Sequence, residues 1–206
     1  KKSGSVRKFK KKSVPAHLVK LVVEAGFWGP SLFGIQPWHF VVIDDRDVLI
    51  ETIKSISYAE MLKQSAAAIL VCGDSLIEKN ESWLLQNCSA SIQNILLSAH
   101  GLGIGSCWIA IHGMDDVYKN VKTQFKLPEN IVPVSLISLG YPDEKVKAEF
   151  PMINGLNKYL YETNITNTGI TYTQYISNNP AIQFDSSQKD SIITGKKMII
   201  FTIGKY

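Results

Sequence analysis

Apolar residues along the chain follow two spacings, one helical and one typical of buried strands. Amphipathic or apolar segments with the 3.6-residue period predict helices, and short β-branched blocks predict strands. The predicted helices cover residues 13–26, 48–56, 82–102 and 115–125, with a short helical piece at 58–64. The predicted strands cover residues 40–43, 66–73, 107–111 and 132–140. Because strands alternate with helices, we expect an α/β or α+β domain with helices packed on a sheet.

The segment before the first strand, residues 30–38, predicts a shaped loop. Pro30 ends the preceding helix, and Gly34 lacks the Cβ restriction on backbone geometry. Ser31 and Gln36 are thereby carried on a stiff frame, which suits a binding surface. An ordinary connection from helix to strand explains the same residues.

The predicted helix at 82–102 has no charged face. Ile92, Ile95 and Ala99 lie on one apolar side, while Ser91 and Leu97 lie on others. A helix without a charged face is expected to be buried all round. We expect either a central core helix or one half of a dimer interface.

Composition fits one globular domain, and the charge is uneven. The 206 residues are 45% hydrophobic and 19% charged. The longest apolar run, residues 66–73, is too short to span a bilayer, so no membrane segment is expected. Residues 1–12 hold seven Lys or Arg and no acid, which leaves 15 basic and 18 acidic residues elsewhere. The basic arm, residues 1–12, can be solvated, meet a ligand phosphate or bind nucleic acid. Because the rest of the chain has no basic excess, no nucleic-acid partner is expected for the domain as a whole.

The sequence lacks the residue spacings that are typical of a catalytic site made of side chains alone. No Gly-x-Ser-x-Gly elbow occurs, the four histidines form no metal-ligand pattern, and no metal site is expected. Three dispersed cysteines favour a reducing cytosol, and a secretory signal is missing from residues 1–12, so a cytoplasmic location is expected. The glycines at 101–106 follow a helix instead of opening one, which argues against a dinucleotide loop. Ser5, Arg7, the 30–38 loop and the 107–111 strand remain, and they suit an enzyme whose cofactor carries the chemistry.

Four stretches in order, spread over residues 3–162, together resemble the nitroreductase family. They are Ser5-Val6-Arg7-Lys8-Phe9, then Pro30-Ser31 with 36–42, then 102–109, then Leu139-Gly140-Tyr141-Pro142. The resemblance implies an α+β fold with a central mixed sheet flanked by helices. It also implies an intertwined homodimer that binds FMN between its subunits and takes electrons from NADH or NADPH. Residues 1–162 would form this domain, and residues 163–206 a C-terminal extension able to form strands at 170–176 and 197–203.

The resemblance also assigns roles to residues. Ser5 and Arg7 would meet the flavin phosphate and ring, and an arginine fork suits phosphate. Ser31 and Gln36 would reach the flavin of the partner subunit. The backbone of residues 108–111 would run along the flavin ring. The complete expected cofactor set is Ser3, Gly4, Ser5, Arg7, Pro30, Ser31, Leu32, Gln36, Trp108, Ile109, Ala110, Ile111 and Lys147.

Some positions differ from the family pattern. Ser3 and Gly4 stand where basic residues are usual, and Gly34 stands where asparagine is usual. Lys147, with Lys158 behind it, is the expected phosphate residue after the Tyr-Pro turn.

The resemblance implies ping-pong hydride transfer from the nicotinamide through the flavin to a nitroaromatic, a quinone or a similar electron-poor acceptor. Flavin N5 would carry the chemistry, and no catalytic side chain is expected. Phe33 and Trp28 would line the acceptor pocket, or else pack in the core. A flavin carrier or sensor without turnover is the alternative.

Overall fold

The computed structural model describes residues 4–145 and 198–201. The helices are α1 (Ala16–Phe27), α2 (Arg46–Ser55), α3 (Glu81–Gly101) and α4 (Asp115–Gln124), with short 3-10 turns η1 (Leu32–Gly34) and η2 (Glu60–Lys63). The strands are β1 (Trp38–Ile43), β2 (Ala67–Asp74), β3 (Gly105–Ala110), β4 (Ile131–Gly140) and β5 (Met198–Phe201). Each helix and strand predicted between residues 13 and 140 is present, with ends that differ by a few residues. The expected strand at 197–203 is confirmed as β5, and the expected strand at 170–176 lies outside the described residues.

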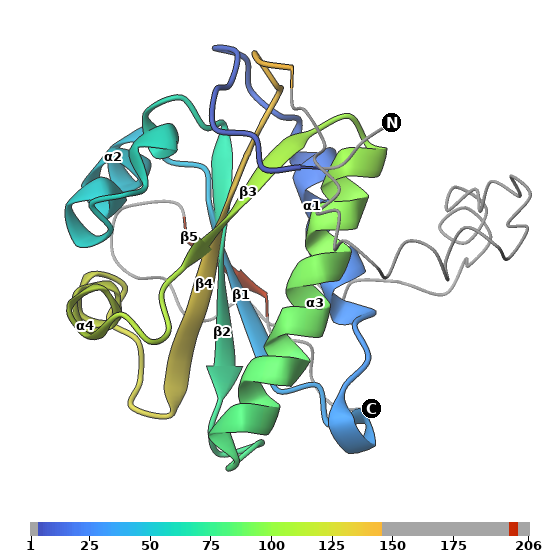
Figure 1. Cartoon of the computed structure of the whole chain (residues 1–206), viewed down its shortest axis with the longest axis vertical. Helices are drawn as coiled ribbons and strands as arrows, with labels where there is room; N and C mark the ends of the chain where they lie inside the picture. The colour runs from blue at the N-terminus through green and yellow to red at the C-terminus, as the bar shows by residue number, and fades with distance from the viewer. Residues whose placement is uncertain (1–3, 146–197, 202–206) are drawn as a thin grey trace, which may run out of the picture.

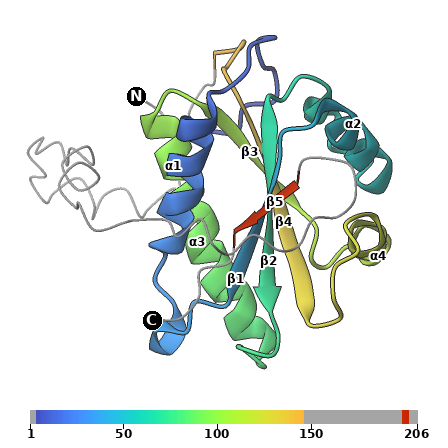
Figure 2. The ribbon, with the colours of Figure 1, turned by 180° about the vertical axis from the view of Figure 1, so that it is seen from behind.

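The molecule has three layers, with the sheet in the middle. The strand order is β3-β4-β2-β1-β5. Helices α1 and α3 cover one face of this sheet, and α2 and α4 cover the other (Figures 1 and 2). The expected α+β fold with a central sheet flanked by helices is therefore confirmed.

The sheet differs in one respect from the mixed sheet that we expected. All four neighbouring strand pairs among the described residues are antiparallel. Helix α2 connects β1 to β2, and α4 connects β3 to β4. A helical connection permits a parallel neighbour but does not require one. The alternation of strands and helices therefore could not fix the strand directions.

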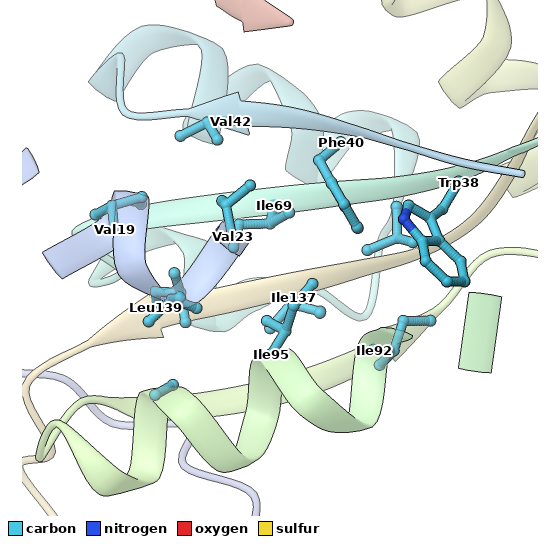
Figure 3. Close-up of a cluster of buried hydrophobic side chains, with 14 of the residues drawn as sticks. Val19, Val23, Trp38, Phe40, Val42, Ile69, Ile92, Ile95, Ile137 and Leu139 are labelled. Atoms are coloured by element: carbon cyan, nitrogen blue, oxygen red, sulfur yellow. The ribbon is translucent and has the colours of Figure 1, made fainter. Parts of the chain in front are cut away.

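A hydrophobic core lies between the sheet and the α1 and α3 layer (Figure 3). Val19 and Val23 of α1 and Ile92 and Ile95 of α3 pack toward the sheet. The strand residues that meet them include Trp38, Phe40, Val42, Ile69, Ile137 and Leu139. A second core on the opposite face joins the strands to α2 and α4. Because both faces are covered, β2 is an almost uninterrupted apolar run.

Helix α3 is buried on one face only within this chain. Leu84, Cys88, Ile92 and Ile95 are all 1% exposed or less. Trp83 on the outer side is 45% exposed and Leu97 is 40% exposed. The prediction that one chain buries this helix all round is therefore wrong. Exposed apolar side chains on a helix without a charged face agree with the other expectation, a surface that meets a second subunit.

The glycines after α3 end the helix, as expected. Gly103 has a φ of +75°, a left-handed conformation that glycine adopts without steric cost. Its N–H donates to the carbonyl of His100 at 3.0 Å, and the chain then enters β3. Within the part of the chain that the structure describes, no helix is long and apolar enough to cross a membrane.

Candidate functional site

The segment that carries Ser5 and Arg7 is fixed to the sheet by its apolar residues. Val6 is 5% exposed and Phe9 is 2% exposed, whereas Gly4, Ser5 and Arg7 are exposed. The Val6 N–H donates to the Ser106 carbonyl of β3 at 2.9 Å. The buried side chains of Val6 and Phe9 thus anchor the segment to the fold, and Ser5 and Arg7 are held at the surface beside the start of β3.

The turn after β4 holds the other side of the same segment. The Lys10 N–H donates to the Tyr141 carbonyl at 2.8 Å, and the Asp143 N–H donates to the Lys8 carbonyl at 2.9 Å. Phe9 and Pro142 form an isolated antiparallel bridge. Two of the four motif stretches, far apart in sequence, are therefore neighbours in the fold.

The charges and hydrogen bonds near the start of β3 affect the pKa of the Cys107 thiol. Burial raises the pKa of its thiol, while the Arg7 charge and a hydrogen bond with the Ser5 side chain oppose that rise. The Glu144 charge adds to the rise in pKa. Ser5, Arg7 and Glu144 thus surround the start of β3.

Strand β3 lies at an edge of the sheet, next to β4 alone among the described strands. Trp108 is 40% exposed and Ala110 is also exposed, whereas Ile109 is buried. Trp108 pairs with Ile137, so Trp108 lies on the face that α1 and α3 cover. An exposed aromatic side chain at an open strand edge is available to a flat ligand.

The buried residues of this stretch turn their side chains into the core, and their backbone faces β4, where the Ile111 N–H donates to the Val134 carbonyl at 3.3 Å. Ile109 and Ile111 are 3% and 0% exposed, and both belong to the core on the other face. The Ser106 carbonyl bonds away from β4, so ladder alternation turns the backbone of Trp108 and Ala110 to the same outer edge. The Tyr58 hydroxyl donates to the Ala110 carbonyl at 2.5 Å, which adds a side chain that the sequence did not single out.

The loop at residues 28–36 is an exposed projection with a defined conformation. Trp28 is 63% exposed and Phe33 is 87% exposed, so neither side chain packs in the core of this chain. Leu32 is 37% exposed, and Pro30 is also exposed. Of the two alternatives for Trp28 and Phe33, core packing is therefore excluded within one chain.

Left-handed backbone conformations make this loop costly to form. Phe33, Gly34 and Gln36 have φ values of 53°, 67° and 46°. Non-glycine residues in this region cost about 1 kcal/mol or more, and they concentrate at ligand-binding sites. The Ser31 hydroxyl accepts the Gln36 N–H at 3.0 Å, and the Gln36 side-chain amide donates to the Phe27 carbonyl at 3.4 Å. The two predicted polar residues of the loop thus stabilise its shape.

Helix α3 provides the base on which the loop is mounted. The Leu32 N–H donates to Oδ1 of Asn87 at 2.9 Å, and the Ser91 hydroxyl donates to the Gly26 carbonyl at 2.8 Å. Asn87 is only 5% exposed. Sequence reasoning missed Asn87, which is one of two asparagines in α3 and, unlike Asn94, follows the buried Leu84 at helical spacing; that spacing was a usable signal, because buried polar groups are normally hydrogen-bonded.

The predicted residues fall into two groups that lie far apart along α3. The first, beside the start of β3, contains Gly4, Ser5 and Arg7, and the second contains Trp28, Pro30, Ser31, Leu32, Phe33 and Gln36. Residues 108–111 lie further along β3, and the next residue, His112, pairs with Glu81, the first residue of α3. The loop contacts α3 at Asn87, whereas β3 begins just beyond its last residue, Gly101. Fourteen residues of helix span roughly 21 Å. Figure 1 shows the loop before β1 and the start of β3 at opposite ends of this helix.

One chain therefore does not bring the two groups together. Ser3 and Lys147 of the expected cofactor set lie outside the described residues. A surface hollow elsewhere is lined by residues of the β2–α3 and β3–α4 connections, including Glu78 and His112. Nε2 of His112 pairs there with the Glu81 carboxylate at 2.9 Å. None of the predicted cofactor residues lines that hollow.

Comparison with known proteins identifies the family. The family model described as "Nitroreductase family" matches residues 3–77 and 61–141. A Methanothermobacter thermautotrophicus protein named "Putative NADH dehydrogenase/NAD(P)H nitroreductase" is 39% identical over 140 residues, which cover 68% of this chain and 73% of that protein.

Solved structures extend the similarity to the fold. The FMN-dependent nitroreductase of Clostridium difficile R20291 is 30% identical, with a TM-score of 0.68 over 76% of this chain and 92% of that one. A Desulfovibrio desulfuricans protein crystallised in complex with FMN is 28% identical, with a TM-score of 0.61 over 72% of this chain and 87% of that one. With its motif stretches in the family's order and its helices and strands in the family's arrangement, the chain belongs to the nitroreductase family.

Proposed function

We propose that this chain is an oxidoreductase that works as a homodimer, holds FMN between its subunits and takes electrons from NADH or NADPH. The observation that carries the proposal is the separation of Ser5 and Arg7 from the 28–36 loop along α3, from the loop contact at Asn87 to the end of the helix at Gly101. A two-fold symmetric dimer can place the loop of one subunit beside β3 of the other. Each flavin would then meet Ser5 and Arg7 of one subunit and Ser31 and Gln36 of its partner.

The exposed apolar side chains supply a reason to dimerise. Trp28, Phe33, Trp83 and Leu97 are each at least 40% exposed, and they lie on the loop and on the outer side of α3. Burying an exposed aromatic side chain stabilises an interface by an order of 1 kcal/mol or more. The strained loop would also be held by its neighbours in the partner subunit.

The residues of the first group fit FMN. Among the described residues the Arg7 guanidinium has no hydrogen-bonded or ion-paired partner, so its planar set of donors is available to a phosphate. Trp108 and Ala110 offer an exposed strand edge with outward-facing backbone, which suits the rim of a flat heteroaromatic ring. Arg7 is close enough to Cys107, which precedes Trp108 in β3, for its charge to act on the pKa of the Cys107 thiol.

Bound FMN supplies hydride transfer at N5, from the nicotinamide and then to an electron-poor acceptor such as a nitroaromatic or quinone, in two half-reactions at one cleft. The chain's own residues bind and orient. Arg7 and Ser5 would hold the phosphate and ring, and the 108–111 backbone would fix the ring edge. Phe33 and Trp28 would form the wall against which the acceptor lies. Water supplies protons at such an open site, so no acid or base residue is required.

The similar proteins support this chemistry. The C. difficile enzyme is named FMN-dependent, the D. desulfuricans protein was crystallised with FMN, and the M. thermautotrophicus name includes NAD(P)H. Three buried cysteines without disulfides, among the described residues, suit the reducing cytoplasm that we propose as its location. We further propose that residues 1–162 form the catalytic domain and that residues 163–206 are an extension. The pairing of β5 with β1 supports a strand-forming role for that extension.

The test is flavin binding followed by anaerobic reduction. FMN added to the purified dimer should give protein-bound oxidised-flavin absorption, which NADH or NADPH should then bleach. Arg7→Ala should weaken FMN binding at least tenfold, whereas Lys119→Ala on the exposed side of α4 should leave it unchanged. Equal FMN affinity of the wild type and Arg7→Ala would remove Arg7 from the site.

Turnover separates the enzyme from the alternative, a flavin carrier or sensor. With FMN in excess, nicotinamide oxidation above the rate of free flavin supports the enzyme, and its absence supports the carrier. Phe33→Ala should change the ranking of nitroaromatic and quinone acceptors when assayed at a protein concentration at which the variant is still a dimer, and it should leave the core of each chain intact, because Phe33 is 87% exposed within one chain. An unchanged ranking would exclude Phe33 from the acceptor pocket.

A further inference from the structure

Glu144 binds the Ser-x-Arg segment through its main chain. Oε1 of Glu144 accepts the Arg7 N–H at 2.6 Å and the Lys8 N–H at 2.9 Å. Two consecutive amides that converge on one anionic oxygen form a small anion-binding arrangement, and such charge-assisted bonds are stronger than neutral ones. Glu144 comes two residues after Pro142, so the turn that follows β4 supplies the carboxylate.

Glu144 acts here in its ionised form. The Arg7 backbone bond, and next the Lys8 backbone bond, lower the pKa of its carboxyl. The positive charges of the Lys8 and Arg7 side chains contribute in the same direction but less, and desolvation opposes them. The bonds to the main chain therefore matter more than attraction to the cationic side chains.

This arrangement leaves the Arg7 side chain available. A carboxylate beside an arginine commonly binds the guanidinium fork itself. Here Glu144 bonds the amide, and within residues 4–145 and 198–201 the guanidinium has no hydrogen-bonded or ion-paired partner. Backbone hydrogen bonds hold Val6 to β3 and Lys10 to the turn after β4. Between them, Glu144 fixes the main chain from which the Arg7 side chain projects.

We propose that Glu144 is the positioning residue for Arg7, which it holds by the main chain so that the guanidinium can meet the FMN phosphate. This proposal rests on the proposed function. Glu144 touches neither the cofactor nor the reacting atoms in this role. A residue that supplies an acceptor oxygen at the same place should therefore substitute for it, and a residue without one should not.

The first test is a double-mutant cycle on FMN affinity, measured by flavin fluorescence on the full chain. Glu144→Ala should weaken FMN binding about tenfold, which corresponds to the loss of charge-assisted bonds to two amides. Glu144→Gln keeps an acceptor and should lie within about threefold of the wild type. The Glu144→Ala, Arg7→Ala pair should bind FMN no more weakly than Arg7→Ala alone, because both changes remove one interaction. The proposal would be overturned if the loss of FMN affinity in the double variant equalled the product of the losses in the two single variants.

The second test needs no flavin. Amide hydrogen exchange of residues 5–9 should accelerate in Glu144→Ala, mainly at Arg7 and Lys8, and should remain slow in Glu144→Gln. Asp143→Ala is the matched control, because it removes the neighbouring acid and keeps the backbone bond from Asp143 to Lys8. Unchanged exchange in Glu144→Ala would overturn the Glu144 contact alone. A wild-type dimer that binds no FMN would overturn the proposed function, and with it the role of Glu144 toward the phosphate.

Discussion

Gly29 lies where the strained loop leaves α1 and crosses α3, and its replacement tests whether that close crossing is needed. A Cβ added at Gly29 would stand 2.8 Å from the Cα and 2.9 Å from the nitrogen of Ser91, and 3.3 Å from the carbonyl carbon of Ala90. Carbon atoms in contact prefer about 3.5–4.0 Å. Gly29→Ala must therefore move the end of α1 away from α3 by roughly 0.7–1.2 Å.

The expected cost follows from the nature of the atoms that collide. Main-chain atoms of a helix cannot rotate away as the end of a side chain can, and overpacking of this kind costs about 1–3 kcal/mol. The lower entropy of the unfolded alanine chain offsets about 0.4–1 kcal/mol. We expect a net loss of about 1–2 kcal/mol, which lowers the Tm by about 2–8 °C for a chain of this size.

Thermal unfolding of the Gly29→Ala dimer, followed by circular dichroism, measures this loss. The matched control is Gly101→Ala at the end of α3, where an added Cβ meets nothing within 4 Å. That change should be neutral or should stabilise by about 0.5–1 kcal/mol, because alanine favours the helix. FMN affinity should fall in Gly29→Ala and not in Gly101→Ala, because Ser31 and Gln36 lie on the loop that follows Gly29. A Tm equal to the wild type would refute the close crossing of α1 and α3.

Three further outcomes are expected. Asp45→Ala should lower the unfolding free energy by about 1 kcal/mol in a denaturant titration. The reason is that the Asp45 carboxylate caps α2, where it accepts the Asp47 and Val48 N–H groups at 2.9 and 3.0 Å. An unchanged unfolding free energy would mean that this cap is unimportant. All three thiols should resist a disulfide reagent in the folded protein and react once it is unfolded, and a rapidly labelled native thiol would contradict their burial. Burial raises the pKa of the Cys88 thiol to about 12 and also raises the pKa values of Cys72 and Cys107. Burial alone would raise the pKa of Asp74, but hydrogen bonds from Asn130 and Leu76, together with the charge and hydrogen bond of His39, outweigh it and lower the pKa below its usual value. The Asp74 carboxylate therefore stabilises the fold above about pH 4 and loses this effect as the pH falls, so the stability difference between wild type and Asp74→Asn should shrink below about pH 4 in acid titrations; a constant difference would contradict the assignment.

The sequence by itself determined the local structure and the residue types of the site. The helical period places Ile92, Ile95 and Ala99 on one side of α3, and these side chains are buried in the core. The apolar run at 66–73 became β2, because such residues favour a strand covered on both faces. The sequence singled out the stretch with Ser5 and Arg7 and the Tyr-Pro turn as motifs, and the fold brings these two segments together.

Only the tertiary structure decided how those elements meet. Strand pairing joins distant segments, so neither the order β3-β4-β2-β1-β5 nor the antiparallel directions could be obtained from local periodicity. Asn87 bonds a residue 55 positions away, and Glu144 bonds one 137 positions away. The separation of the two groups of site residues is likewise a consequence of the length and placement of α3. Local sequence sets the conformation of each segment, but hydrogen bonds between distant segments depend on the packing of the whole chain.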